Sequence, residues 1–367
     1  MNNKKSIGLF SAISIGIGGM IGAGIFSILG VSAKISGNAL YLSFMIAGIV
    51  ALFCTYSYAK LGVKYPSAGG PVEFLIKGLG DGITAGGFNI FLWVGYIFVL
   101  ALYAKAFAGY AATFIVADAS GLLLNILATV IILIFTGVNF IGAKAVGKSE
   151  LTIVIIKVGM LLVFAAAGLF FIKPNLLALS NWPKFPNIIF GAGVVFVAYE
   201  GFGLVTNAAE DMENPEKTLP KALYLSVVIT IFIYIIISII VVGNLPISKI
   251  IDAKEYALAA AVKPFLGLIG FKIAAIVAMF STSSAINATI YGGANVSYTM
   301  AKEGQLPGNF KRKIWRWGYE GLFITSGLVI VFINLLNLEG VALLGSASFL
   351  CIYTAVNIAH VKIYKET

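Results

Sequence analysis

The sequence has little charge, one histidine and two cysteines. Of its 367 residues only 11% are charged, whereas a soluble domain has about 25%. So few charges cannot cover a water-facing surface, and the same composition excludes disorder, coiled coil and collagen. His360 is a single residue near the C-terminus, so a His-based metal site or a Ser/His/Asp triad is not expected. Cys54 and Cys351 lie in apolar runs and predict no disulfide framework.

Apolar residues dominate instead, at 60% of the chain, with a mean hydropathy of +0.99. Runs of about 20 apolar residues cross a bilayer as helices. Ten runs predict an all-α membrane protein, at 6–34, 39–62, 82–115, 121–141, 149–172, 187–210, 219–242, 263–300, 320–336 and 340–361. No stretch looks like a soluble domain. Residues 1–367 are therefore predicted to form a single transmembrane domain, without cofactor or metal.

The net charge of +10 has a topological interpretation. In a soluble protein it would suggest nucleic acid, but in a membrane protein basic residues mark cytoplasmic loops. With the N-terminus in the cytoplasm, most basic residues fall inside, among them Lys60, Lys64 and Lys311. Ten spans then predict a multi-pass protein of the plasma membrane with both termini cytoplasmic, and no nucleic-acid partner.

The spans form two series with matching spacing. The first three begin near 6, 39 and 82, and the sixth to eighth begin about 180 residues later. The halves 6–172 and 187–361 each hold five spans, an odd number, so they must cross the membrane in opposite directions. Inverted repeats of this kind are typical of secondary transporters.

Glycines are dense in the first span, at 16, 18, 19, 22 and 24. Small residues allow close helix packing, but this density favours an unwound segment. The matching segment 196–203 of the sixth span has two glycines and Glu200. Broken helices at matching positions predict a substrate site. Freed N–H groups favour a carboxylate and freed carbonyls an ammonium, so the expected substrate is an amino acid.

Lysine 157 lies deep in the fifth span, where a lysine costs roughly 2.5–3.5 kcal/mol on insertion scales. Snorkelling is hard from this depth, and burial disfavours the charged form. Lys157 and Glu200 are therefore the candidates for gaining and losing a proton during transport. Lys105 and Lys272 lie nearer the outer ends of their spans and are expected at the interface.

Four consecutive hydroxyl residues occupy positions 281–284 of the eighth span. Such hydroxyls often bond their own helix, but four in a row face several directions, so some must meet neighbouring helices. Ser283 and Ser284 are candidates to support a cation-sized site among the first, fifth and eighth spans. The Lys157 ammonium would stand there in place of a sodium ion.

Five motifs carry a resemblance to a known family. They are GMIGAGIF at 19–26, AYEGFG at 198–203, NAAEDMENP at 207–215, NATIYGGAN at 287–295 and AKEGQLP at 301–307. From about Ser6 to His360 the chain resembles the amino acid–polyamine–organocation transporters. It is most similar to proton-coupled amino-acid symporters with a lysine in the fifth helix. Most members have twelve spans, so this chain would contain the ten-helix core.

The resemblance implies a fold and a set of site residues. The fold is the leucine-transporter-like arrangement of five plus five inverted helices. The substrate carboxylate would be held by the N–H groups of Gly22, Ala23 and Gly24. The ammonium would meet carbonyls at Met20, Val197, Ala198 and Glu200. Lys157 would be the proton-coupling residue, with a carbonyl near Gly18 as its partner.

The predicted function is proton-coupled symport of amino acids by alternating access. The alternatives are an exchanger of amino acids or amines, a sensor built on a transporter fold, and a channel, which broken helices argue against. A membrane enzyme is not expected, because the spans hold no nucleophile–base pair or metal cluster. The particular amino acid and the oligomeric state are left open.

Overall fold

A computed structural model describes residues 7–67, 69–116, 118–141, 146–314 and 320–367, with the side chains of Ala23 and residues 146–150 outside the description. Within these ranges the chain is helical, with one isolated β-bridge between Ile7 and Met212. The long helices are α1 (Leu9–Ser36), α2 (Leu40–Lys64), α4 (Ile83–Ala112), α5 (Gly121–Ile141), α6 (Val146–Leu169), α9 (Pro215–Asn244), α11 (Ala257–Lys302), α12 (Glu320–Leu335) and α13 (Leu338–Lys362). An apolar chain in lipid forms helices because each backbone polar group must be satisfied within the segment.

Eight helical segments in the described part of the chain are long and apolar enough to span a membrane. One of them, Leu9–Lys64, contains α1 and α2 joined by a short 3₁₀ turn, and Glu320–Leu335 is a shorter apolar helix. The bounds of α5 coincide with the predicted run 121–141. The predicted all-α membrane fold is confirmed, while the count of ten spans and the single-domain boundaries stay predictions.

The sixth predicted span is divided into three helical pieces. It contains α7 (Phe185–Val195), the 3₁₀ helix η5 (Phe196–Gly203) and α8 (Leu204–Asn207). The expected break is thus a change from α to 3₁₀ geometry over eight residues. The matching prediction for the first span is wrong in this structure, because α1 is a continuous α-helix through all its glycines.

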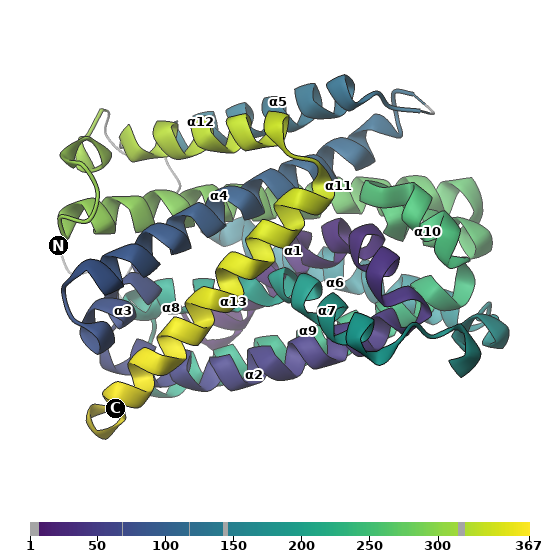
Figure 1. Ribbon diagram of the computed structural model, residues 1–367. Helices are drawn as coiled ribbons and strands as arrows, with labels where there is room; N and C mark the ends of the chain where they lie inside the picture. Colours follow the sequence, from purple (N-terminus) through teal and green to yellow (C-terminus); the bar gives the residue numbers. More distant parts are fainter. Residues whose placement is uncertain (1–6, 68, 117, 142–145, 315–319) are drawn as a thin grey trace.

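The helices pack in pairs that the 180-residue spacing relates. α2 packs along α9, α4 along α11, and α1 against η5; α2 and α9 run side by side in Figure 1. The last helix, α13, crosses α4 at the front of that view. This pairing fits two repeats packed on each other, with α1 and η5 at the centre.

The two ends of the molecule are held differently. At one end, backbone bonds join Ile7 to Asp211 and Glu213, at 3.2 and 3.1 Å. At the other, Lys34 and Glu339 form an ion pair at 2.8 Å. There α11 is also kinked at Gly267, whose φ of +63° suits glycine.

Candidate functional site

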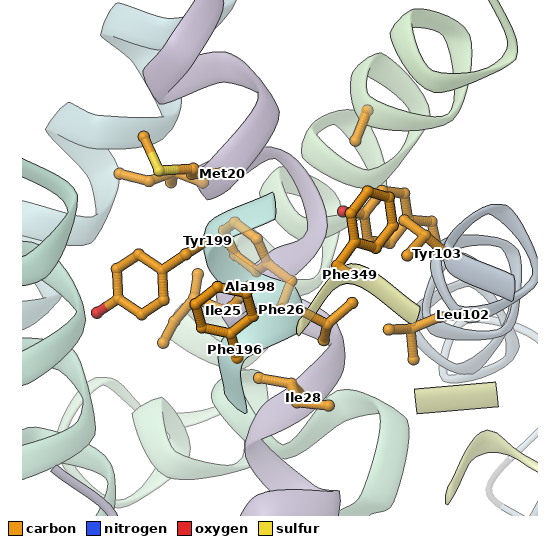
Figure 2. Close-up of a cluster of buried hydrophobic side chains, with 14 of the residues drawn as sticks. Met20, Ile25, Phe26, Ile28, Leu102, Tyr103, Phe196, Ala198, Tyr199 and Phe349 are labelled. Atoms are coloured by element: carbon orange, nitrogen blue, oxygen red, sulfur yellow. The ribbon is translucent and has the colours of Figure 1, made fainter. Parts of the chain in front are cut away.

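The candidate site lies where α1 and η5 meet backbone to backbone. A Cβ added to Gly201 would overlap the backbone of Gly19 and Met20, and one on Gly24 would lie 2.8 Å from Ala198. Figure 2 shows η5 against α1, with Ala198 beside Ile25. Gly19 and Gly24 therefore allow close packing of η5 on α1, which is continuous through both.

Two carbonyl groups from these elements face one hydroxyl. The Tyr234 hydroxyl of α9 lies 2.5 Å from the oxygen of Met20 and 3.0 Å from that of Ala198. A phenol has one proton, so it donates to one of the two at a time. Two of the four carbonyls predicted to bind an ammonium thus converge on a common point. Val197, a third, is buried in the same 3₁₀ helix.

The N–H groups predicted to bind a carboxylate lie in the same turn of α1. Gly22 packs against α11, where an added Cβ would lie 2.8 Å from that of Ala285. The backbone of Ala23 continues the helix, and its side chain is outside the description. Within an α-helix these N–H groups of Gly22, Ala23 and Gly24 bond the carbonyls four residues earlier. A substrate carboxylate could use them only if this turn opened.

Lys157 of α6 reaches the other side of α1. Its Nζ donates to the carbonyl oxygen of Gly18 over 2.9 Å, and the residue is 2% exposed. The structure thus brings together the lysine and the glycine that the sequence analysis paired. Gly18 and Met20 both accept bonds from outside α1. Because a carbonyl has two lone pairs, these bonds can add to the helical ones.

The hydroxyls of α11 divide between two roles. Ser281 donates to the carbonyl oxygen of Ile21 in α1 at 3.0 Å, while Thr282 bonds its own helix at Ala278, at 2.8 Å. The predicted residues Ser283 and Ser284 are half-buried on the same helix. Since α1, α6 and α11 pack on one another, the three predicted spans meet, and Lys157 bonds α6 to α1.

Glu200 faces away from this carbonyl site. Its Oε1 accepts a bond from the Tyr103 hydroxyl of α4 at 3.0 Å. Its backbone oxygen, predicted to meet the ammonium, accepts a bond from Tyr353 of α13 at 2.6 Å. The structure therefore places the Glu200 carbonyl apart from those of Met20 and Ala198.

Three tyrosines of the site, Tyr103, Tyr234 and Tyr353, were not among the residues predicted from the sequence. A signal was present, because a hydroxyl in an apolar span needs a partner, but the partner cannot be read from the run. The environment of Lys105 also differs from the prediction, which placed this lysine at the membrane interface. It is only 8% exposed, and its Nζ donates to Asn125 at 3.0 Å.

Two surface cavities lie away from these residues. One of about 390 Å³ is lined by Lys60, Lys64 and Tyr224, and one of about 360 Å³ by Lys249, Lys263 and Phe271. Neither is lined by a residue of the candidate site. Within the described residues, no group of three or more His, Cys, Asp or Glu side chains could hold a metal ion.

Comparison with known proteins agrees with this architecture. Residues 7–367 match the family model described as amino acid permease. An uncharacterized protein of Methanocaldococcus jannaschii is 47% identical over 98% of this chain and 83% of its own length. The inner membrane transport protein YbaT of Escherichia coli is 33% identical over 99% and 84%. The branched-chain amino acid permease BcaP of Bacillus subtilis is 28% identical over 84% and 70%. The chain therefore belongs to the amino acid permease family and is a multi-pass membrane transporter rather than an enzyme.

Proposed function

We propose that this transporter imports amino acids together with protons by alternating access. The observation that carries the proposal is the bond between Lys157 and the Gly18 carbonyl, 2.9 Å long and buried between α6 and α1. A charged donor forms a hydrogen bond roughly twice as strong as a neutral one. The protonation state of Lys157 would therefore set how tightly α6 holds α1. Proton loss toward the cytoplasm would loosen that hold and favour the inward-facing state.

The proposed substrate is an amino acid held by its charged ends. The Met20 and Ala198 carbonyls converge on one point, and carbonyls of this kind suit an ammonium. When the turn at Gly22, Ala23 and Gly24 opens, its N–H groups would suit a carboxylate. The names of relatives, including a branched-chain amino acid permease, support this class. We assign the protein to the cytoplasmic membrane, with both termini inside.

Uptake into proteoliposomes tests the proposal. A thermal-shift screen against the twenty amino acids would first select a substrate that stabilises the protein. Its labelled form should then enter vesicles faster under an inward proton gradient than without one. Lys157→Ala should lose this stimulation, while Lys272→Ala, a lysine exposed on α11, should keep it.

Other outcomes separate the alternatives. An exchanger would need substrate inside the vesicles and ignore the gradient. A sensor would bind substrate without uptake. Uptake that is indifferent to the gradient and is retained in Lys157→Ala would disprove proton coupling through this residue.

A further inference from the structure

The Glu200 carboxyl is buried on the side of η5 opposite to the Tyr199 ring. The residue is 2% exposed. In Figure 2, Tyr199 extends to one side of η5, while Tyr103 and Phe349 lie on the other. The Tyr199 hydroxyl bonds the Phe44 carbonyl of α2, whereas Glu200 Oε1 accepts from Tyr103 of α4 at 3.0 Å. The Glu200 carboxyl is thus bonded from α4 and its backbone carbonyl from α13, whereas Lys157 bonds α1.

The second oxygen of this carboxyl, Oε2, is buried and has no hydrogen-bond partner among the described residues. The Tyr58 hydroxyl of α2 is likewise buried and has no hydrogen-bond partner among the described residues. Unpartnered buried oxygens are rare in proteins and call for an explanation.

Among the described residues, the titratable groups that face Glu200 are tyrosines. Those near enough to interact with a charge on its carboxyl, if it carried one, are Tyr58 of α2, Tyr96 and Tyr103 of α4, Tyr234 of α9 and Tyr353 of α13. The remaining elements packed on η5 add no such group: α7 and α8 hold no titratable residue, and Lys34 of α1 pairs with Glu339. Within the described ranges no lysine, arginine or histidine forms an ion pair with Glu200.

An ionised carboxylate in such surroundings is strongly disfavoured. A buried charge without a counter-charge tends to neutralise, and one bond from a tyrosine does not replace the water it has lost. We infer that Glu200 is a proton-binding site separate from Lys157 and that it holds its proton as a neutral acid while η5 is packed as observed. The proton comes from water and adds to one carboxylate oxygen, and the neutral acid can share a hydrogen bond with Tyr103 in either direction.

The position of Glu200 links this proton to the arrangement of the site. The next residue, Gly201, lies against the backbone of Gly19 and Met20. The backbone carbonyl of Glu200 accepts a hydrogen bond from the Tyr353 hydroxyl. A movement of η5, together with α1, away from α4 and α13 that admitted water would let the carboxyl ionise. Proton release from Glu200 would then accompany the opening of the site.

Infrared spectroscopy of the reconstituted protein tests the inference directly. At neutral pH the wild type should show a protonated-carboxyl band that is missing in Glu200→Gln. The matched control is Glu210→Gln, at an exposed position of the 3₁₀ turn Ala209–Asp211, which should keep the band. A wild-type spectrum that matches Glu200→Gln in this region would overturn the inference.

Thermal stability gives an independent measurement. Glutamine has the shape of the neutral acid but cannot ionise, whereas the unfolded wild-type chain ionises this glutamate above about pH 4. Because the packed wild type keeps the proton, its melting temperature should fall relative to that of Glu200→Gln as the pH rises from about 4 to 7. A difference in melting temperature that stays constant over this range would show that Glu200 ionises in the packed protein as readily as in the unfolded chain, against the inference. Neither measurement depends on transport, so a failure here leaves the proposed symport standing, and a failure of uptake leaves this inference standing.

Discussion

The Tyr234 hydroxyl of α9 lies 2.5 Å from the carbonyl oxygen of Met20. It thus hydrogen-bonds an oxygen that we propose as a ligand of the substrate ammonium. The same hydroxyl is 3.0 Å from the Ala198 oxygen on η5. It therefore stands where an ammonium would bridge α1 and η5. A substrate has to displace it, and the hydroxyl competes with the substrate for the site.

Tyr234→Phe is expected to tighten substrate binding. Removing the competing donor should lower KM by about 3- to 10-fold, because a hydrogen bond is worth about 1 kcal/mol net. Uptake kinetics in proteoliposomes measure this. Tyr199→Phe is the matched control, since it removes an equally buried hydroxyl that bonds Phe44 instead. An unchanged or raised KM in Tyr234→Phe would contradict the competition.

Lys157→Met is expected to separate function from folding. Methionine fills similar space and removes a buried charge, and such replacements are often neutral or stabilising. We expect a melting temperature equal to or above the wild type, together with loss of stimulation by the proton gradient. Scanning fluorimetry and uptake on the same preparation measure both. A large drop in melting temperature would instead assign Lys157 a structural role.

Gly201→Ala is expected to disrupt the contact between η5 and α1. The added methyl group overlaps the backbone of Gly19, and overpacking of this kind costs about 1–3 kcal/mol. Uptake should fall sharply and the melting temperature should drop. Gly193→Ala in α7 has open space at the same atom and should be tolerated, because alanine favours a helix by about 1 kcal/mol over glycine. Equal effects at both positions would argue against a specific contact.

The predicted orientation can be tested with single cysteines. In a background with Cys54→Ala and Cys351→Ser, Lys249→Cys should react with an impermeant maleimide added to intact cells. Lys217→Cys should react only after permeabilisation, because we place it on the cytoplasmic side. The reverse pattern would invert the topology.

The helices could be predicted from the sequence because the bilayer leaves an apolar run few other structures. The run 121–141 coincides with α5 for this reason. The departure from α geometry at 196–203 was also predictable, since Gly201 and Gly203 follow Glu200 there. Whether α1 is unwound or continuous could not be predicted. Glycine density fits both an unwound turn and close packing, and the deciding partner, Gly201, lies in the other half of the chain.

The site was predictable only in part. The depth of Lys157 marked it as unusual, but its partner Gly18 came from the resemblance to a family and not from spacing. The bonds of Tyr234 and Ser281 to α1 depend on how distant helices pack. No local pattern distinguishes a tyrosine that bonds a neighbouring helix from one that faces lipid.

The backbone pairing of Ile7 with residues 211–213 has a consequence for how the protein can move. Two backbone hydrogen bonds, at 3.2 and 3.1 Å, fasten the start of α1 to the chain that follows α8. A tilt of either segment has to carry the other with it or break both bonds. We therefore expect the first and sixth spans to tilt together as one rigid unit. The outer sides of this pair would then slide against α4, α6 and α11.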